Sequence, residues 1–84
     1  MYELKFSENS LRELEKLEKQ QHERIIKSLE RIRVRPQTYL KKLVGSPYFS
    51  FRVGNYRVIL DFKESELLIF VITLGHRKNI YDKI

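Results

Sequence analysis

The sequence contains no cysteine, and this absence removes a whole class of chemistry. Without thiols, the chain has no disulfide, no thiolate nucleophile and no cysteine-based zinc site. No apolar run is as long as a membrane span, and the amino terminus lacks the layout of a signal peptide. These absences favour a cytoplasmic protein that has no membrane partner.

Most catalytic motifs are missing as well. The chain has only two histidines, His22 and His76, and it has no HExxH motif, no glycine-rich phosphate loop and no motif of paired carboxylates. We therefore expect no metal and no cofactor, and any catalysis has to use arginine, tyrosine, histidine and lysine. A chain of 84 residues predicts a single domain, residues 1–84.

Acidic residues are scarce in the middle of the chain. Residues 1–34 carry eight Lys/Arg and seven Asp/Glu, a net charge of +1, whereas residues 35–84 carry nine and four, a net charge of +5. The stretch between Glu30 and Asp61 holds no acid and seven bases, namely Arg31, Arg33, Arg35, Lys41, Lys42, Arg52 and Arg57. Such a stretch is typical of a polyanion-binding surface, and a solvated high-pI surface is the alternative.

Two of these arginines face each other in a predicted β-hairpin. Residues 48–53 alternate apolar and polar side chains, Gly54-Asn55 is a two-residue turn, and residues 56–62 resume as a second strand. A glycine-first turn favours a type II′ hairpin, which pairs Arg52 with Arg57. Like charges directly opposite each other destabilise a sheet by up to about 1 kcal/mol, so we expect the arginines to hold an external anion.

The same alternation assigns the two faces of the hairpin. The apolar face is expected to comprise Phe49, Phe51, Val53, Tyr56, Val58 and Leu60. The opposite face is expected to comprise Tyr48, Ser50, Arg52, Arg57, Ile59 and Asp61. Asp61 is the only acid on this second face, and we expect it to form an ion pair with a nearby arginine.

The first part of the chain predicts a strand and a helical hairpin. Residues 2–6 alternate as a short strand, and Ser7 is a suitable N-cap for a first helix. Apolar residues then recur at helical spacing on both sides of Gln20-Gln21, where we expect the bend between two helices. The second helix is expected to end near Val34, because Pro36 disfavours helical geometry at the residue before it.

The rest of the chain completes an α+β domain. Residues 36–47 form a connector with one possible helical turn, whose apolar residues are expected to fill the core: Tyr39, Leu40, Leu43 and Val44. Residues 67–74 are apolar on both faces, as in a central strand, and Gly75 is expected to end that strand. The order β-α-α-β-β-β predicts a helical hairpin packed on one face of a small, twisted, mostly antiparallel sheet, with the other face open.

A family resemblance rests on two segments, Asn55-Tyr56-Arg57-Val58-Ile59-Leu60 and Gly75-His76-Arg77-Lys78-Asn79-Ile80-Tyr81, with the apolar strand between them. In this order and spacing, the chain resembles the RelE side of the RelE/ParE toxin superfamily over its whole length. The resemblance implies a type II toxin that inhibits translation as a ribosome-dependent endoribonuclease, or mRNA interferase. The implied reaction is attack of the RNA 2′-hydroxyl on the adjacent phosphate in the decoding site.

The resemblance also implies catalytic roles for individual residues. Arg57 matches the family arginine that binds the scissile phosphate and stabilises its transition state. Arg77 matches an arginine that acts at the phosphate and the leaving oxygen. Tyr81 matches a tyrosine that stacks on a base or assists proton transfer, and His76 is an auxiliary in acid–base chemistry.

Five further residues are expected to bind RNA: Arg52, Lys41, Lys42, Lys78 and Tyr48. Arg52 is expected to position a phosphate rather than to take part in the chemistry. Lys41 and Lys42 are expected to contact phosphates of ribosomal RNA or an acidic partner, with simple solvation as the alternative.

The chain departs from the family in its missing lysines. Some members place lysines on the first hairpin strand, near the attacking 2′-hydroxyl, where this chain has Tyr48 and Ser50. Two alternatives therefore stay open. One is a gyrase inhibitor like the ParE toxins, and the other is an RNA-binding domain without catalytic activity.

The resemblance further implies partners: the ribosome, messenger RNA and a small, partly disordered antitoxin of the RelB type, in a heterotetrameric toxin–antitoxin complex. We expect an acidic antitoxin helix to lie on the helical hairpin, in a groove rimmed by Arg12, Lys16, Lys19, Arg24 and Lys27. A second antitoxin segment is expected near residues 75–84, where it would mask Arg77 or displace Tyr81.

Overall fold

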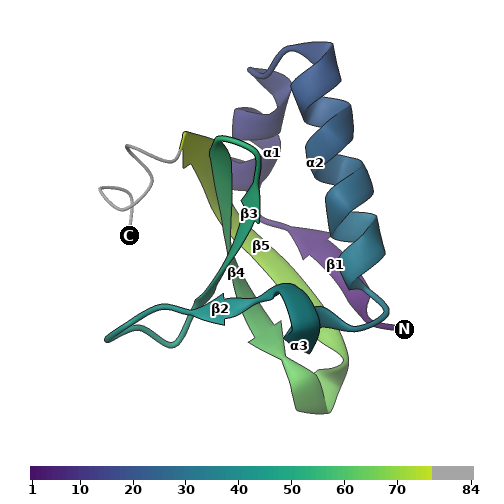
Figure 1. Cartoon of the computed structure of the whole chain (residues 1–84), viewed down its shortest axis with the longest axis vertical. Coiled ribbons are helices and arrows are strands. Elements are labelled where there is room, and N and C mark those ends of the chain that lie inside the picture. Colours follow the sequence, from purple (N-terminus) through teal and green to yellow (C-terminus); the bar gives the residue numbers. More distant parts are fainter. Residues whose placement is uncertain (77–84) are drawn as a thin grey trace.

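The computed structural model describes residues 1–76, and these form a five-stranded mixed sheet with two helices against one face (Figure 1). The elements are β1 (Glu3–Phe6), α1 (Glu8–Glu15), α2 (Lys19–Ile32), α3 (Pro36–Tyr39), β2 (Lys41–Lys42), β3 (Phe49–Val53), β4 (Tyr56–Lys63), a 3₁₀ turn (Glu64–Glu66) and β5 (Leu68–His76). The strand order is β1-β5-β4-β3-β2, in which only the β1–β5 pair is parallel. The predicted α+β class and mostly antiparallel sheet are confirmed.

The core lies between the helices and one face of the sheet. On α2, the fully buried residues Ile25, Leu29 and Ile32 recur every three or four positions, which is the spacing that keeps them on one helix face. They pack with Phe51, Val53, Val58 and Leu60 of the hairpin and with Ile69, Val71 and Leu74 of β5. Within residues 1–76, no helix is both long and apolar enough to cross a membrane.

Helix α1 covers the part of the β5 edge that β1 leaves open. Strand β1 pairs only with Leu68–Val71 of β5. Beyond that point, the Ser7 hydroxyl donates to the carbonyl of Ile72 at 2.6 Å and accepts from the backbone N–H of Ser10 at 3.0 Å, as an N-cap does. The Glu13 carboxylate accepts from the Leu74 backbone N–H at 3.1 Å and the Thr73 hydroxyl at 2.6 Å. These contacts keep the open edge from pairing with another chain.

The predicted hairpin register is confirmed. Arg52 is the register partner of Arg57, and Val53 is that of Tyr56. Gly54 has a φ of +59°, the left-handed region that a type II′ turn requires at its first central position and that glycine adopts without a Cβ clash. The register slips by one residue between Ile59 and Leu60 in the pairing of β4 with β5.

Two boundaries differ from the sequence prediction. The bend between the helices lies at residues 16–18, and Gln20-Gln21 belongs to the first turn of α2. Glutamine is a good helix former, so a polar pair does not by itself break a helix. Gly75 does not end the last strand, because it pairs with Arg57 and β5 continues to His76.

The connector forms the predicted helical turn, α3, but it fills the core less than expected. Leu40 packs against the core, whereas Tyr39 is 45% exposed and Val44 is fully exposed. The reason is the strand β2, which the sequence does not predict. Its Lys41–Lys42 pair with Ser50 and Phe49 of β3, and the following loop projects from the sheet as an arm (Figure 1). Val44 belongs to this arm and is therefore exposed.

Candidate active site

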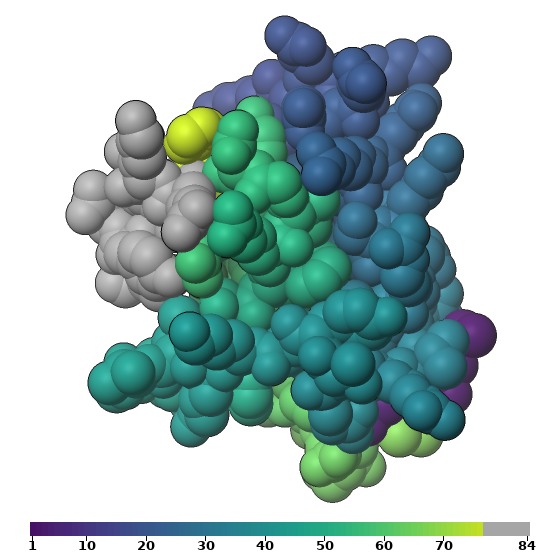
Figure 2. All heavy atoms as spheres, viewed as in Figure 1, coloured from purple at the N-terminus to yellow at the C-terminus, as the bar shows by residue number. Residues whose placement is uncertain are grey.

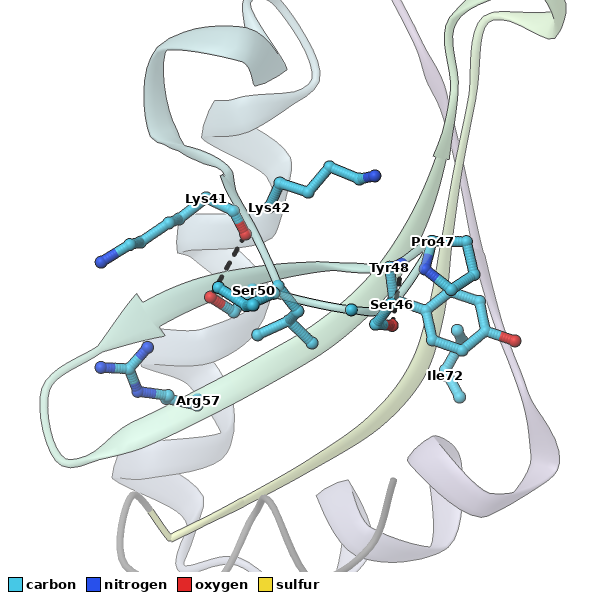
Figure 3. Close-up of a pocket in the computed structure, with 11 residues that line it drawn as sticks. Lys41, Lys42, Ser46, Pro47, Tyr48, Ser50, Arg57 and Ile72 are labelled. Atoms are coloured by element: carbon cyan, nitrogen blue, oxygen red, sulfur yellow. Dashed lines mark hydrogen bonds between the residues drawn. The ribbon is translucent and has the colours of Figure 1, made fainter.

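A pocket of about 770 Å³ lies between this arm and the face of the sheet that the helices leave uncovered. Residues 41–48 form one wall, and Ser50, Arg57 and Ile72 come from the three neighbouring strands. Figure 3 shows Arg57 at one end of the pocket and Tyr48, Pro47 and Ile72 at the other. The pocket therefore offers a cationic end and a more apolar end, with an aromatic ring at the latter.

Arg57 is held rigidly at the cationic end. Its position on β4 is fixed by pairing on both sides, with Arg52 of β3 and with Gly75 of β5. The side chain is half-buried, and its Nε atom is buried. A guanidinium with two terminal nitrogens directed into a pocket is suited to bidentate contact with a phosphate.

Two lysines from β2 add further positive charge to the pocket. Lys41 is the register partner of Ser50, whose hydroxyl donates to the Lys41 carbonyl at 3.4 Å. In Figure 3 the Lys41 side chain extends toward the side where Arg57 lies, and Lys42 extends the opposite way. Within residues 1–76, neither lysine forms an ion pair with a carboxylate, and no acid lines the pocket. The charge of the two lysines therefore favours an anion in the pocket.

The arm that closes the pocket has a defined local structure. Gly45 adopts a φ of +72°, and the Ser46 hydroxyl accepts from the backbone N–H of Tyr48 at 3.1 Å. Leu43 and Val44 supply apolar surface to the same wall. From the sequence, these residues are expected to belong to a connector and the core, and their part in the pocket is not predicted. The Gly45-Ser46-Pro47 sequence is the only signal of a shaped loop.

The predicted site residues do not all gather in this pocket. Lys41, Lys42, Tyr48 and Arg57 line it together. Arg52 lies outside it, and its Nε donates to the Gly54 carbonyl at 3.2 Å. Arg77, Lys78 and Tyr81 lie outside the described residues.

His76 is directed to the opposite side of the sheet. It is the register partner of Tyr56, whose ring it meets edge-on at 5.8 Å between ring centroids. With Tyr56, it lines a hollow beside Glu13, Lys16 and Leu17, at the end of the helical hairpin. The structure therefore does not bring His76 to Arg57.

The ionic partner expected for Asp61 also differs. Asp61 forms an ion pair with Lys63 at 3.5 Å rather than with an arginine. Arg33, one of the seven bases of the acid-free stretch, pairs with Glu30 at 2.7 Å and donates from Nε to the Tyr2 carbonyl. Lys63 is two positions from Asp61 on β4 and so shares its side of the sheet, whereas Arg57 is four positions away along the same strand.

The chemistry of the pocket follows from its lining. Cationic groups stabilise negative charge that develops on a phosphate, while no carboxylate or imidazole of residues 1–76 lines the pocket to remove a proton. Among residues 1–76, no group of three or more histidine, aspartate or glutamate side chains is arranged to hold a metal ion. The apolar end, with Tyr48, is suited to the flat face of a base.

The sequence of this chain matches the model of a known protein family. The model of the family described as "ParE toxin of type II toxin-antitoxin system, parDE" matches residues 4–81. Among curated proteins, none matches the chain in sequence.

Solved structures agree with the family match. The isolated E. coli RelE toxin is 27% identical, with a TM-score of 0.77 over 99% of this chain and 94% of that one. The intact E. coli RelBE toxin–antitoxin complex contains a chain that is also 27% identical, with a TM-score of 0.77 over 90% and 96%. The RelBE2 complex of Mycobacterium tuberculosis, at 22% identity, shares the fold with a TM-score of 0.83 over 90% and 98%.

Proposed function

Because this chain belongs to the ParE toxin family of type II toxin–antitoxin systems, within the RelE/ParE superfamily, we propose that it is a RelE-type toxin that cleaves messenger RNA on the ribosome. One observation carries the proposal. Arg57 is fixed at the cationic end of a pocket that also holds Lys41 and Lys42, and no carboxylate of residues 1–76 lines this pocket. Such a pocket suits the phosphate of an RNA strand, and it is of little use to a neutral or cationic ligand.

The reaction would begin with the substrate's own 2′-hydroxyl. Its oxygen attacks the adjacent phosphorus, and the bond from phosphorus to the 5′-oxygen of the next nucleotide breaks, which leaves a 2′,3′-cyclic phosphate and a 5′-hydroxyl. The 2′-hydroxyl proton is lost and the 5′-oxygen gains one, so the charge balances. The negative charge that builds on the phosphate oxygens is stabilised by the Arg57 guanidinium, a contribution of several kcal/mol for such a preorganised group.

Lys41 would take the place of the lysines that some family members carry on the first hairpin strand. Ser50 occupies one of those positions here, and Lys41 is its register partner on the adjacent strand. The ammonium group of Lys41 on β2, the strand next to β3, therefore lies at the same pocket. Near the attacking oxygen, that positive charge favours the ionised 2′-hydroxyl.

The lining of the pocket also explains why the ribosome would be needed. Among residues 1–76, no strong base lines the pocket, so this part of the chain has little means to activate an RNA that moves freely. A ribosome that holds the RNA near in-line geometry supplies orientation, which in favourable cases is equivalent to about 7–11 kcal/mol of the barrier. We therefore expect little cleavage of free RNA.

By resemblance, Arg77 would contact the phosphate and the leaving oxygen, and Tyr81 would stack on a base or move a proton. His76 has no part in this scheme, because its ring contacts Tyr56 on the helix side of the sheet. The neutralising partner would be an antitoxin of the RelB type, since several structurally similar toxins are found in complexes with RelB. A heterotetramer is the proposed assembly.

A ParE-like inhibitor of DNA gyrase is the second candidate function. It is favoured by the name of the matching family and by Tyr48 and Ser50 at positions where some RelE-type toxins have lysines. A gyrase inhibitor needs a binding surface but no group that stabilises a transition state. The two candidates therefore differ in whether the loss of Arg57 abolishes a chemical step.

One experiment separates the candidates. Purified chain is incubated with translating ribosomes, and new 5′ ends of the messenger RNA are mapped, while a parallel reaction follows supercoiling by DNA gyrase. The proposal predicts new 5′-hydroxyl ends on ribosome-bound RNA and unchanged supercoiling. Inhibited supercoiling without new RNA ends would favour the ParE-like function.

A further inference from the structure

A second basic surface lies outside the pocket, in a groove between α2 and strand β3. The groove has a volume of about 410 Å³, and four basic residues line it: Arg24, Lys27, Arg31 and Arg52. Figure 2 shows the atoms of α2, in blue, lying directly against those of the β3–β4 hairpin, in green. We propose that this groove is a second RNA-binding site, which holds the phosphate backbone of a strand outside the pocket.

The four cations form a continuous row. Arg24, Lys27 and Arg31 are spaced by three and four residues, so they lie on one face of α2 and span about 10 Å along its axis. Arg52 comes from the neighbouring strand, and the Arg24 guanidinium lies against Gly54 at the hairpin turn, since a Cβ placed on that glycine would meet its Nη1 at 2.8 Å. The row thus runs from the helix to the tip of the hairpin.

No acid in the described part of the chain neutralises this row. Within residues 1–76, none of the four side chains forms an ion pair, and no acid lines the groove. The nearby Glu30 of α2 is engaged by Arg33 at 2.7 Å. Four cations held close together repel one another and release counterions when a polyanion binds, which makes binding to a phosphate chain favourable and dependent on salt.

Two features favour RNA over an acidic protein segment as the occupant. The first is an aromatic pair at the groove, in which Tyr39 is 45% exposed and meets Phe51 edge-on at 6.3 Å between centroids. An exposed ring beside arginines is a platform on which a base can stack. The second is continuity, because Arg52 is the register partner of Arg57, so the groove adjoins the pocket across the hairpin. The choice of RNA as the occupant rests on the proposed function.

The test measures binding of a short 2′-O-methyl oligouridylate by fluorescence anisotropy, because this RNA lacks the attacking hydroxyl and cannot be cleaved. The groove variant is Lys27→Gln/Arg31→Gln. Both residues are exposed on α2, and glutamine has a similar helix propensity. The matched control is Lys5→Gln/Lys63→Gln, which removes the same charge from exposed positions outside the groove. Circular dichroism melting confirms that each variant folds.

The dependence of the RNA affinity on salt concentration is the decisive measurement. For single strands, each lost phosphate contact lowers the slope of log Kd against log salt by about 0.7, so the groove variant should lose about 1.4 in slope and at least about tenfold in affinity at low salt. The control should change the slope much less. Equal effects of the two variants would overturn the inference.

A glutamate-rich peptide serves as the second probe. If the groove variant loses affinity for the peptide but binds the RNA like the control, the groove binds an acidic protein segment and the inference is wrong. Cleavage on ribosomes is a separate measurement, because it tests the proposed function and not the groove. A chain that cuts nothing on ribosomes, yet shows the groove-dependent slope, refutes the proposed function and leaves the second RNA site standing.

Discussion

Arg52 of β3 and Arg57 of β4 are direct register partners across the hairpin, yet their side chains serve two different surfaces. Arg57 lines the pocket under the β2–β3 arm, and Arg52 lines the groove beside α2. Arg52 is exposed and donates from Nε to the Gly54 carbonyl at 3.2 Å. The two-residue turn thus places like charges opposite each other where the basic pocket meets the basic groove. This pairing of like charges costs up to about 1 kcal/mol of sheet stability.

The first prediction follows from this pairing. Replacing Arg52 by threonine removes the repulsion and introduces a good strand former, so Tm should rise slightly in low salt. The gain over the unaltered chain should shrink as salt is added, because salt screens the charges. Thermal melts across a salt series measure this. A variant that is less stable than the parent at every salt concentration would mean that Arg52 has a structural role that outweighs the repulsion.

The second prediction concerns Lys41. If its ammonium acts near the attacking 2′-hydroxyl, Lys41→Gln should lower the rate of cleavage on ribosomes by about tenfold or more, with no change in Tm. Lys63→Gln is the matched control, because Lys63 is an exposed lysine whose partner is Asp61, away from the pocket. Single-turnover rates at saturating toxin separate a slower chemical step from weaker binding. Equal rates for the two variants would assign Lys41 to the solvated surface.

The third prediction tests how α1 is attached to the sheet. Glu13→Ala removes the acceptor of the Leu74 N–H and the Thr73 hydroxyl, and Thr73 is only 1% exposed. Leaving the buried Thr73 hydroxyl without this acceptor costs about 1–3 kcal/mol, so unfolding in urea should require clearly less denaturant. Glu15→Ala, on an exposed position of the same helix, is the control and should change stability by less than about 0.5 kcal/mol. Similar midpoints for the two variants would contradict this role.

The features that the sequence predicts correctly are those set by local rules. The turn at Gly54-Asn55 and the alternation of its flanking strands are sufficient to place Arg52 opposite Arg57. The cap at Ser7 is likewise visible in the sequence, since a serine hydroxyl meets the N–H of Ser10 three residues later. In both cases, the residues that determine the geometry are neighbours along the chain.

The features that the sequence misses depend on contacts between distant residues. Strand β2 is two lysines long, and only its pairing with Phe49 and Ser50 makes it a strand, so no pattern in the sequence marks it. From the sequence alone, Glu13 resembles a solvated acid on a helix surface. Its contact with the sheet appears only in the fold, where β5, about 60 residues later in the chain, lies beside it. The pocket is missed for the same reason, because β2 and its arm must be in place before Lys41 and Arg57 share a cavity.

The most direct test of the central claim is the rate at which Arg57→Ala cleaves messenger RNA on translating ribosomes. If Arg57 stabilises the charge that develops on the scissile phosphate, cleavage should fall by about 100-fold or more, while Tm and ribosome binding change little. Arg57→Lys should not restore full activity, because a single ammonium cannot make the bidentate contact. Cleavage by Arg57→Ala at the rate of the unaltered chain would contradict the account.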